Sequence, residues 1–226
     1  MEPVNIALYW DNLTLQQATL PAHHVKQGER VHVMMPEKAQ QLFLDMVFRC
    51  PLSQDDTLEQ HVWLSNGGQK VLAGSDAFCR HLACMLRQRG LLANLTLKEN
   101  LLLPFLYADR KEDLKHAEKA LMDVVEFLDM QDKLDEKAGE RPPYIHALIS
   151  LGHCLLKKPS IVVAQDVHWG MTEEHSQRFQ RKMLCALKTW NPGILYLSSA
   201  VPEHAELPFQ RTCTLEGDVS SNMEWS

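Results

Sequence analysis

The chain has 226 residues, of which 45% are hydrophobic and 23% charged, and its formal net charge is -6. This length and composition suit a globular chain that buries a core without disulfides or metal ions, and the acidic balance argues against a nucleic-acid-binding surface. The six scattered cysteines predict a reduced, cytosolic protein, and the apolar runs fall far short of the ~20 residues that a membrane span needs.

The first part of the chain is predicted to be rich in β-structure. Short runs of apolar and β-branched residues are typical of strands there, and they cover residues 5–10, 12–15 and 29–35. Apolar residues at helical spacing then predict a helix over residues 36–50.

A turn signal dominates the next segment. The turn Asn66-Gly67-Gly68 lies between two β-rich pieces and predicts a hairpin within residues 61–74. A short helix is expected over residues 75–88, with Ser75 or Asp76 as its N-terminal cap.

The middle of the chain is predicted to be helical. Residues 109–140 are heavily charged and carry apolar residues at helical spacing, which predicts an amphipathic helix with a solvated face. Pro142 and Pro143 interrupt this pattern, and a more apolar helix is expected over residues 144–158.

Strand and helix alternate again toward the C-terminus. A strand is expected over residues 160–166, a helix over about 173–189 and a strand over 193–199, and the tail 216–226 is expected to be frayed. This alternation predicts an α/β core with a parallel sheet, whose ligands would bind beyond the C-terminal ends of the strands. The segments that follow those ends are 34–41, Gln165-Asp166 and Ser198-Ser199.

The order and spacing of four segments resemble the nucleotide-binding domain of ABC transporters over nearly the whole chain. "QGERVHVMMPEKAQQLFLDM" resembles the Walker A strand, loop and helix, and "MLRQRGLLANLTLKENLLLP" resembles the Q-loop segment. "HALISLGHCLLKKPSIVVAQDV" is similar to the helix and strand that lead into Walker B, and "ILYLSSAVPEHAEL" to the strand and H-loop that follow. The Leu-Thr-x-x-Glu-Asn and Leu-Pro pattern of the Q-loop segment is closest to the lipid-trafficking (MCE/Mla-type) ATPases.

The resemblance implies a P-loop NTPase-like α/β fold. It would have a mostly parallel sheet, an N-terminal antiparallel β part and an inserted helical subdomain, all within one domain over residues 1–226. The expected boundaries are 1–90 and 156–215 for the α/β core, 91–155 for the helical subdomain and 216–226 for the tail.

The Walker A positions depart from the family pattern. A working P-loop uses glycines, a Lys and a Ser or Thr to hold phosphates and Mg²⁺. The matching stretch contains no glycine, and Gln41 and Leu42 stand where the Lys and the Ser or Thr should be. Pro36 and Glu37 precede them, Glu37 adds negative charge, and Lys38 is displaced from the family position.

The Walker B and H-loop positions depart as well. Gln165 replaces the metal-binding Asp, and a neutral amide is a poor partner for Mg²⁺. Asp166 replaces the Glu that positions the attacking water, Ser199 replaces the H-loop His, and Leu15 stands near the position of the aromatic residue that stacks on adenine.

The signature motif is also replaced, and one motif residue survives. Pro142, Pro143 and Tyr144 occupy the signature positions, while Gln88 matches the Q-loop glutamine. Gln88 links the nucleotide site to the helical lobe in the family, although a loop amide without a ligand is an equal alternative. "LSNGGQ" (64–69) resembles the missing signature, but β-rich sequence flanks it and a hairpin turn is favoured.

The residues favour a degenerate ABC subunit, a pseudo-ATPase with a structural or regulatory role and no cofactor or metal site. Its expected partners are a membrane permease, contacted by the helical lobe, and a second ABC ATPase or a copy of itself. It would act in the cytoplasm at the inner face of a membrane. One alternative is a divergent active ATPase that uses Lys38 and Asp166 with ATP and Mg²⁺; another is an α/β interaction module unrelated to ABC proteins.

Overall fold

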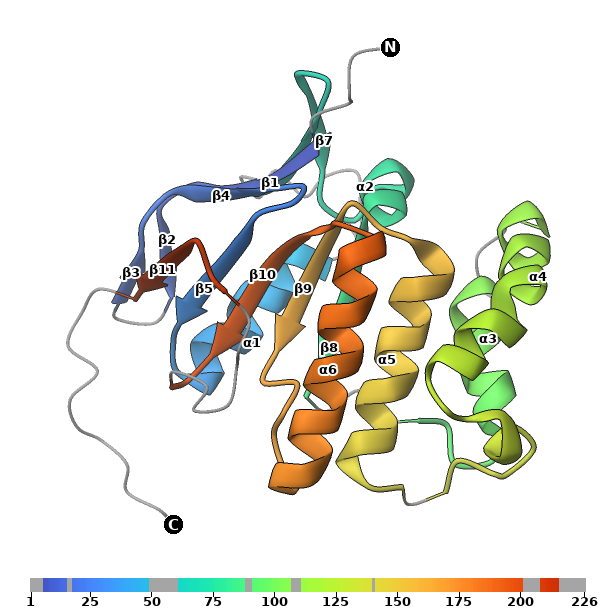
Figure 1. Ribbon diagram of the computed structural model, residues 1–226. Coiled ribbons are helices and arrows are strands. Elements are labelled where there is room, and N and C mark those ends of the chain that lie inside the picture. The colour runs from blue at the N-terminus through green and yellow to red at the C-terminus, as the bar shows by residue number, and fades with distance from the viewer. Residues whose placement is uncertain are drawn as a thin grey trace.

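The protein combines a parallel sheet, an antiparallel sheet and helices (Figure 1). The computed structural model describes residues 6–15, 18–48, 61–87, 91–106, 111–139, 141–200 and 208–215. Gln88 and the tail 216–226, both singled out from the sequence, lie outside these residues.

The central sheet has five strands, and all its neighbouring pairs are parallel. Its order is β11 (Arg211–Thr214), β5 (Arg30–Met34), β10 (Gly193–Ser198), β9 (Ile161–Gln165) and β8 (Leu82–Leu86). Every residue of β9 and β10 is buried, as expected for central strands covered on both faces. The predicted α/β core with a parallel sheet is therefore confirmed.

The N-terminal part of the chain forms the second sheet. Its antiparallel order is β4 (His23–Lys26), β1 (Ile6–Trp10), β6 (Val62–Asn66) and β7 (Gln69–Leu72). A separate ribbon pairs β2 (Leu13–Leu15) with β3 (Ala18–Leu20). The turn between β6 and β7 places Gly67 and Gly68 at positive φ, so the predicted hairpin is confirmed at the segment that resembles a signature motif.

Helices cover both faces of the parallel sheet. The helices are α1 (Glu37–Phe48), α2 (Asp76–His81), α3 (Leu97–Leu106), α4 (Lys111–Phe127), α5 (Pro143–Lys157) and α6 (Glu173–Thr189), with a 3-10 turn at Gln131–Lys133. Figure 1 shows α5 and α6 side by side on one face, α1 on the other, and α3 with α4 beyond the β8 edge. Ser75 and Thr172 cap α2 and α6 through their hydroxyl groups.

The parallel sheet separates two apolar cores. Val162 and Ala164 of β9 join the core beneath α3, α4, α5 and α6, whereas Ile161 and Val163 join the core between α1 and the antiparallel sheet. The side chains of β9 therefore alternate between the two cores. The expected boundaries of the helical subdomain at residues 91 and 155 stay a prediction. The last helix of that subdomain, α5, packs on β8 of the sheet as well as on α3 and α4.

Two helices predicted from the sequence are wrong at their C-terminal ends. The helix predicted over 75–88 ends at His81, and Leu82–Leu86 instead forms β8 at the sheet edge, where pairing with β9 overrides the helical pattern. The helix predicted over 109–140 ends at Phe127, close to Asp129, whose φ of 56° lies outside the helical region. None of the helices in the described ranges has the length and apolar character to cross a membrane.

Candidate functional site

The C-terminal ends of the parallel strands define the candidate site. Leu86, Gln165 and Leu197 lie level with one another on β8, β9 and β10, and Ser198 lies level with Met34 on β5. The residues that follow these strands therefore emerge at one edge of the sheet, where ligands of open α/β sheets bind.

The connection from β5 to α1 is only two residues long. Met35 and Pro36 separate the strand from the helix, which begins at Glu37. Gln40 is fully buried in the first turn, and its Nε2 donates to the carbonyl oxygen of Met35 at 3.0 Å. This hydrogen bond ties the buried side chain of Gln40 to the backbone of the connection.

The remaining Walker A positions lie on α1 and face solvent. Lys38 and Gln41 are exposed, and Nε2 of Gln41 donates to Oδ1 of Asp45 one turn further along the helix. Leu42 is 40% exposed. Gln41 and Leu42 therefore lie within the helix rather than in a loop.

Asp166 follows β9 directly and adopts an unusual backbone conformation. Gln165 ends the strand and is 7% exposed, and Asp166 has φ of 40°. The backbone N–H of Asp166 donates to the carbonyl oxygen of Leu197 at 3.0 Å, which holds the backbone of Asp166 at the sheet edge. Burial raises the pKa of the Asp166 carboxyl, and the Gln40 amide and the Arg87 guanidinium only partly offset that effect.

Arg87 is a site residue that the sequence did not single out. It follows β8 directly, and its Nη1 lies 3.2 Å from Oε2 of Glu37. Its Cζ lies 3.8 Å from the centre of the Trp169 ring, a cation–π contact. Recognising Leu82–Leu86 as a strand would have placed Arg87 at this edge.

The signature positions begin α5 and pack within the chain. Pro142 is the N-cap, Pro143 is the first helical residue, and both are exposed. Tyr144 is 7% exposed and stacks on His175, with ring centroids 4.6 Å apart. A Cβ added at Gly170 would lie 3.3 Å from Cγ of Pro143, so the loop after β9 lies close to this helix start.

The remaining positions lie in different parts of the structure. Ser199 follows β10, and its backbone N–H donates to the Asp166 carboxyl. Leu15, near the expected adenine-stacking position, is 1% exposed and belongs to a core. Within the described ranges, no three His, Cys, Asp or Glu side chains form a group that could hold a metal ion.

Comparison with solved structures identifies the fold. The chain aligns with MJ1267, an ATP-binding cassette of an ABC transporter in its ADP conformation, at a TM-score of 0.64 and 14% identity over 88% of this chain and 83% of that one. The fold is that of an ATP-binding cassette. A second structure, cbiO1 from Clostridium perfringens, part of the ABC transporter complex cbiONQ, gives a TM-score of 0.68 and 8% identity over 92% of this chain and 84% of that one.

A third structure, the ATP-binding subunit of an ABC transporter, gives a TM-score of 0.68 and 17% identity over 93% of this chain and 86% of that one. No protein-family model matches the sequence, and no curated protein matches it. At these identities the comparison shows the cassette fold alone.

Proposed function

We propose that this chain is a catalytically inactive ATP-binding-cassette subunit with a structural or regulatory role in an ABC transport complex. The observation that carries the proposal is the two-residue connection between β5 and α1. The phosphate-binding loop of P-loop proteins needs several consecutive backbone N–H groups, with glycines that let the chain curve around the phosphates. Met35 and Pro36 cannot supply that loop, and Pro36 has no N–H at all.

The charges at the start of α1 support the same proposal. A helix N-terminus favours anions, but Glu37 places a carboxylate there, and Oε2 of that carboxylate lies 3.2 Å from Nη1 of Arg87. A triphosphate would have to displace this ion pair and tolerate a neighbouring negative charge. The residues present at this edge do not fit Mg·ATP.

The partner proposal rests on the fold. The structural neighbour cbiO1 is part of an ABC transporter complex. By analogy we propose that the helical lobe of this chain, α3 and α4, contacts a membrane permease, and that the sheet edge faces a second ABC ATPase or another copy of this chain. The chain would then lie in the cytoplasm, held at the membrane by its permease. Residues 95–104 carry the Leu-Thr-x-x-Glu-Asn and Leu-Pro pattern that resembles lipid-trafficking ATPases. We therefore propose lipid as the class of substrate that the complex transports.

Isothermal titration of the purified chain with Mg·ATP tests the proposal. We expect no binding at micromolar concentrations, because the phosphate loop and its Lys are replaced. Micromolar binding would overturn the proposed function.

Phosphate release provides a second measurement, on the chain alone and with its partner subunit, for the wild type and for Asp166→Ala. We expect no difference between the two chains. Release that disappears in Asp166→Ala would favour the active, divergent ATPase.

A further inference from the structure

Arg87 connects three segments that are far apart in the sequence. It follows β8, its guanidinium pairs with Glu37 at the start of α1, and it stacks on Trp169 in the connection from β9 to α6. β8 and β5 are not neighbours, because β9 and β10 lie between them in the sheet. The side chain of Arg87 therefore reaches across the edge of the sheet that carries the candidate site.

The surroundings of Arg87 explain why it stays in this position. Its side chain is only 15% exposed, and a buried guanidinium is costly unless its charge is balanced. The carboxylate of Glu37 and the face of the Trp169 ring provide that balance, and the Asp166 carboxylate adds attraction. Glu37 and Trp169 are 58% and 52% exposed, so neither is held in place by burial alone.

We propose that Arg87, Glu37 and Trp169 form an intramolecular clasp that holds the end of β8, the start of α1 and the connection from β9 to α6 in one arrangement without a nucleotide. The inference rests on the proposed function, since a chain that bound ATP would need to open the clasp. The clasp holds the edge in a permanently ordered state. A partner subunit would therefore meet the same surface whether or not ATP is present.

Hydrogen exchange measured by mass spectrometry on the full chain, without nucleotide, tests the clasp. Three backbone N–H groups report on it: those of Gln40, Asp166 and Trp169, which donate to Pro36, Leu197 and Asp166. In Arg87→Ala we expect peptides that contain these amides to exchange about tenfold faster, because a partly buried cation–π contact and an ion pair are lost together. Peptides from β1 and α4 should keep their wild-type rates.

Two further variants make the test specific. Glu37→Gln removes only the charge of an exposed side chain and should accelerate the same peptides to a smaller extent, so it decides the question if Arg87→Ala fails to fold. Lys38→Ala is the matched control, because Lys38 is exposed at the same helix end and forms no ion pair with any residue that the structure describes.

Unchanged exchange at Gln40, Asp166 and Trp169 in Glu37→Gln, or in Arg87→Ala where that variant folds, would overturn the clasp. Equal acceleration in Lys38→Ala would overturn it as well, since any lost cation would then have the same effect. Neither result bears on ATP binding, which the titration of the wild-type chain decides separately.

Discussion

Two aspartates share a rare backbone conformation but lie in opposite electrostatic environments. Asp166 and Asp129 have φ of 40° and 56°. Burial raises the pKa of Asp166, whereas hydrogen bonds from Lys182 and Arg178 lower the pKa of Asp129. The fold thus disfavours the ionised form of Asp166 at the candidate site and favours the ionised form of Asp129 beside Lys182 and Arg178.

We expect Asp166→Asn to stabilise the protein at neutral pH. The asparagine keeps the shape, tolerates positive φ and removes a charge that burial disfavours, so the free energy of unfolding should rise by about 0.5 kcal/mol after allowance for solvent screening. Because the folded-state pKa is raised, the wild type loses stability as the pH rises from the unfolded pKa through the folded one. The benefit should therefore vanish in acid, which urea denaturation from pH 3 to pH 8 would show.

Asp129→Asn is the matched control for that measurement. Its folded-state pKa is lowered, so the ionised carboxyl contributes stability above the unfolded pKa, and that contribution is lost as the pH falls through the folded pKa. The variant should be less stable than the wild type at neutral pH and equal to it in acid. A loss of stability in Asp166→Asn at neutral pH would contradict the account of its environment.

The position of Asp166 at the sheet edge can be predicted from the sequence, whereas that of Arg87 cannot. Asp166 ends an apolar run, so its place at the sheet edge follows from the pattern alone. Arg87 follows a strand that the sequence presents as the end of a helix, and its contacts with Glu37 and Trp169 depend on the order of strands in the sheet. Such contacts between distant segments have no local signal.

Elements with strong periodicity were predictable, and two short edge strands without a turn signal were not. α6 has the predicted bounds Glu173–Thr189, and β9 and β10 lie within the predicted strands. The strands β4 and β11 were not predicted, since each has only four residues and contains charged or histidine side chains. Pairing with a longer neighbour, rather than local propensity, determines their structure.

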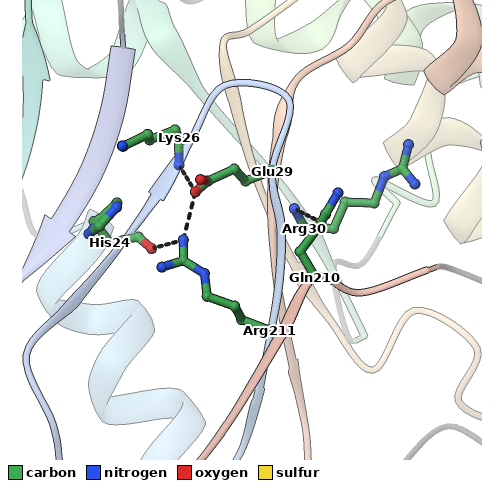
Figure 2. Close-up of polar contacts among 6 residues, drawn as sticks. All are labelled: His24, Lys26, Glu29, Arg30, Gln210 and Arg211. Carbon is green, nitrogen blue, oxygen red and sulfur yellow. Dashed lines mark hydrogen bonds and ion pairs between the residues drawn. The ribbon is translucent and has the colours of Figure 1, made fainter.

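β11 is fastened to the turn between β4 and β5 by polar contacts (Figure 2). Nη2 of Arg211 lies 2.6 Å from Oε2 of Glu29 and donates to the carbonyl oxygen of His24 at 3.2 Å. The same Glu29 oxygen accepts from the backbone N–H of Lys26 at 3.0 Å. Beside them, Oε1 of Gln210 accepts from the backbone N–H of Arg30.

We expect Arg211→Ala to weaken this attachment. The free energy of unfolding should fall by about 1 kcal/mol, because a half-buried, charge-assisted contact is lost. Although burial alone would raise the pKa of Glu29, the Lys26 N–H and Arg211 lower it overall, so the deficit should fade as the pH falls through the folded-state pKa. Urea denaturation at pH 7 and in acid measures both effects.

Arg30→Ala is the control for Arg211→Ala. Arg30 bonds to Gln210 through backbone atoms: its N–H donates to Oε1 of Gln210, and its carbonyl oxygen accepts from the backbone N–H of Gln210. Figure 2 shows the side chain of Arg30 pointing away from Glu29. This variant should therefore keep nearly the wild-type stability. Equal losses in the two variants would show that the ion pair of Arg211 does not fasten β11.

At the scale of the molecule, the parallel sheet couples the two cores. Leu101 of α3 packs in the core under the helices, and Phe43 of α1 packs in the core on the opposite face. Both cores include residues of β9, so loss of packing in either core exposes one face of a strand that the other core also uses. β10 also lies against the antiparallel sheet at Gly193, where an added Cβ would lie only 2.3 Å from the carbonyl oxygen of Lys26.

This coupling predicts that the helical lobe and the α/β core unfold together. Leu101→Ala and Phe43→Ala should each lower the free energy of unfolding by about 3 kcal/mol, because each removes a fully buried side chain. Unfolding in urea should give coincident transitions by tryptophan fluorescence, which reports partly on buried Trp10 beside Phe43, and by circular dichroism, which reports mainly on the helices. If Leu101→Ala shifted the helical signal to lower urea and left the fluorescence transition in place, the lobe would be an independent folding unit. The boundaries predicted at residues 91 and 155 would then mark a separate core, and contacts of α5 with β8 would be too weak to transmit the loss.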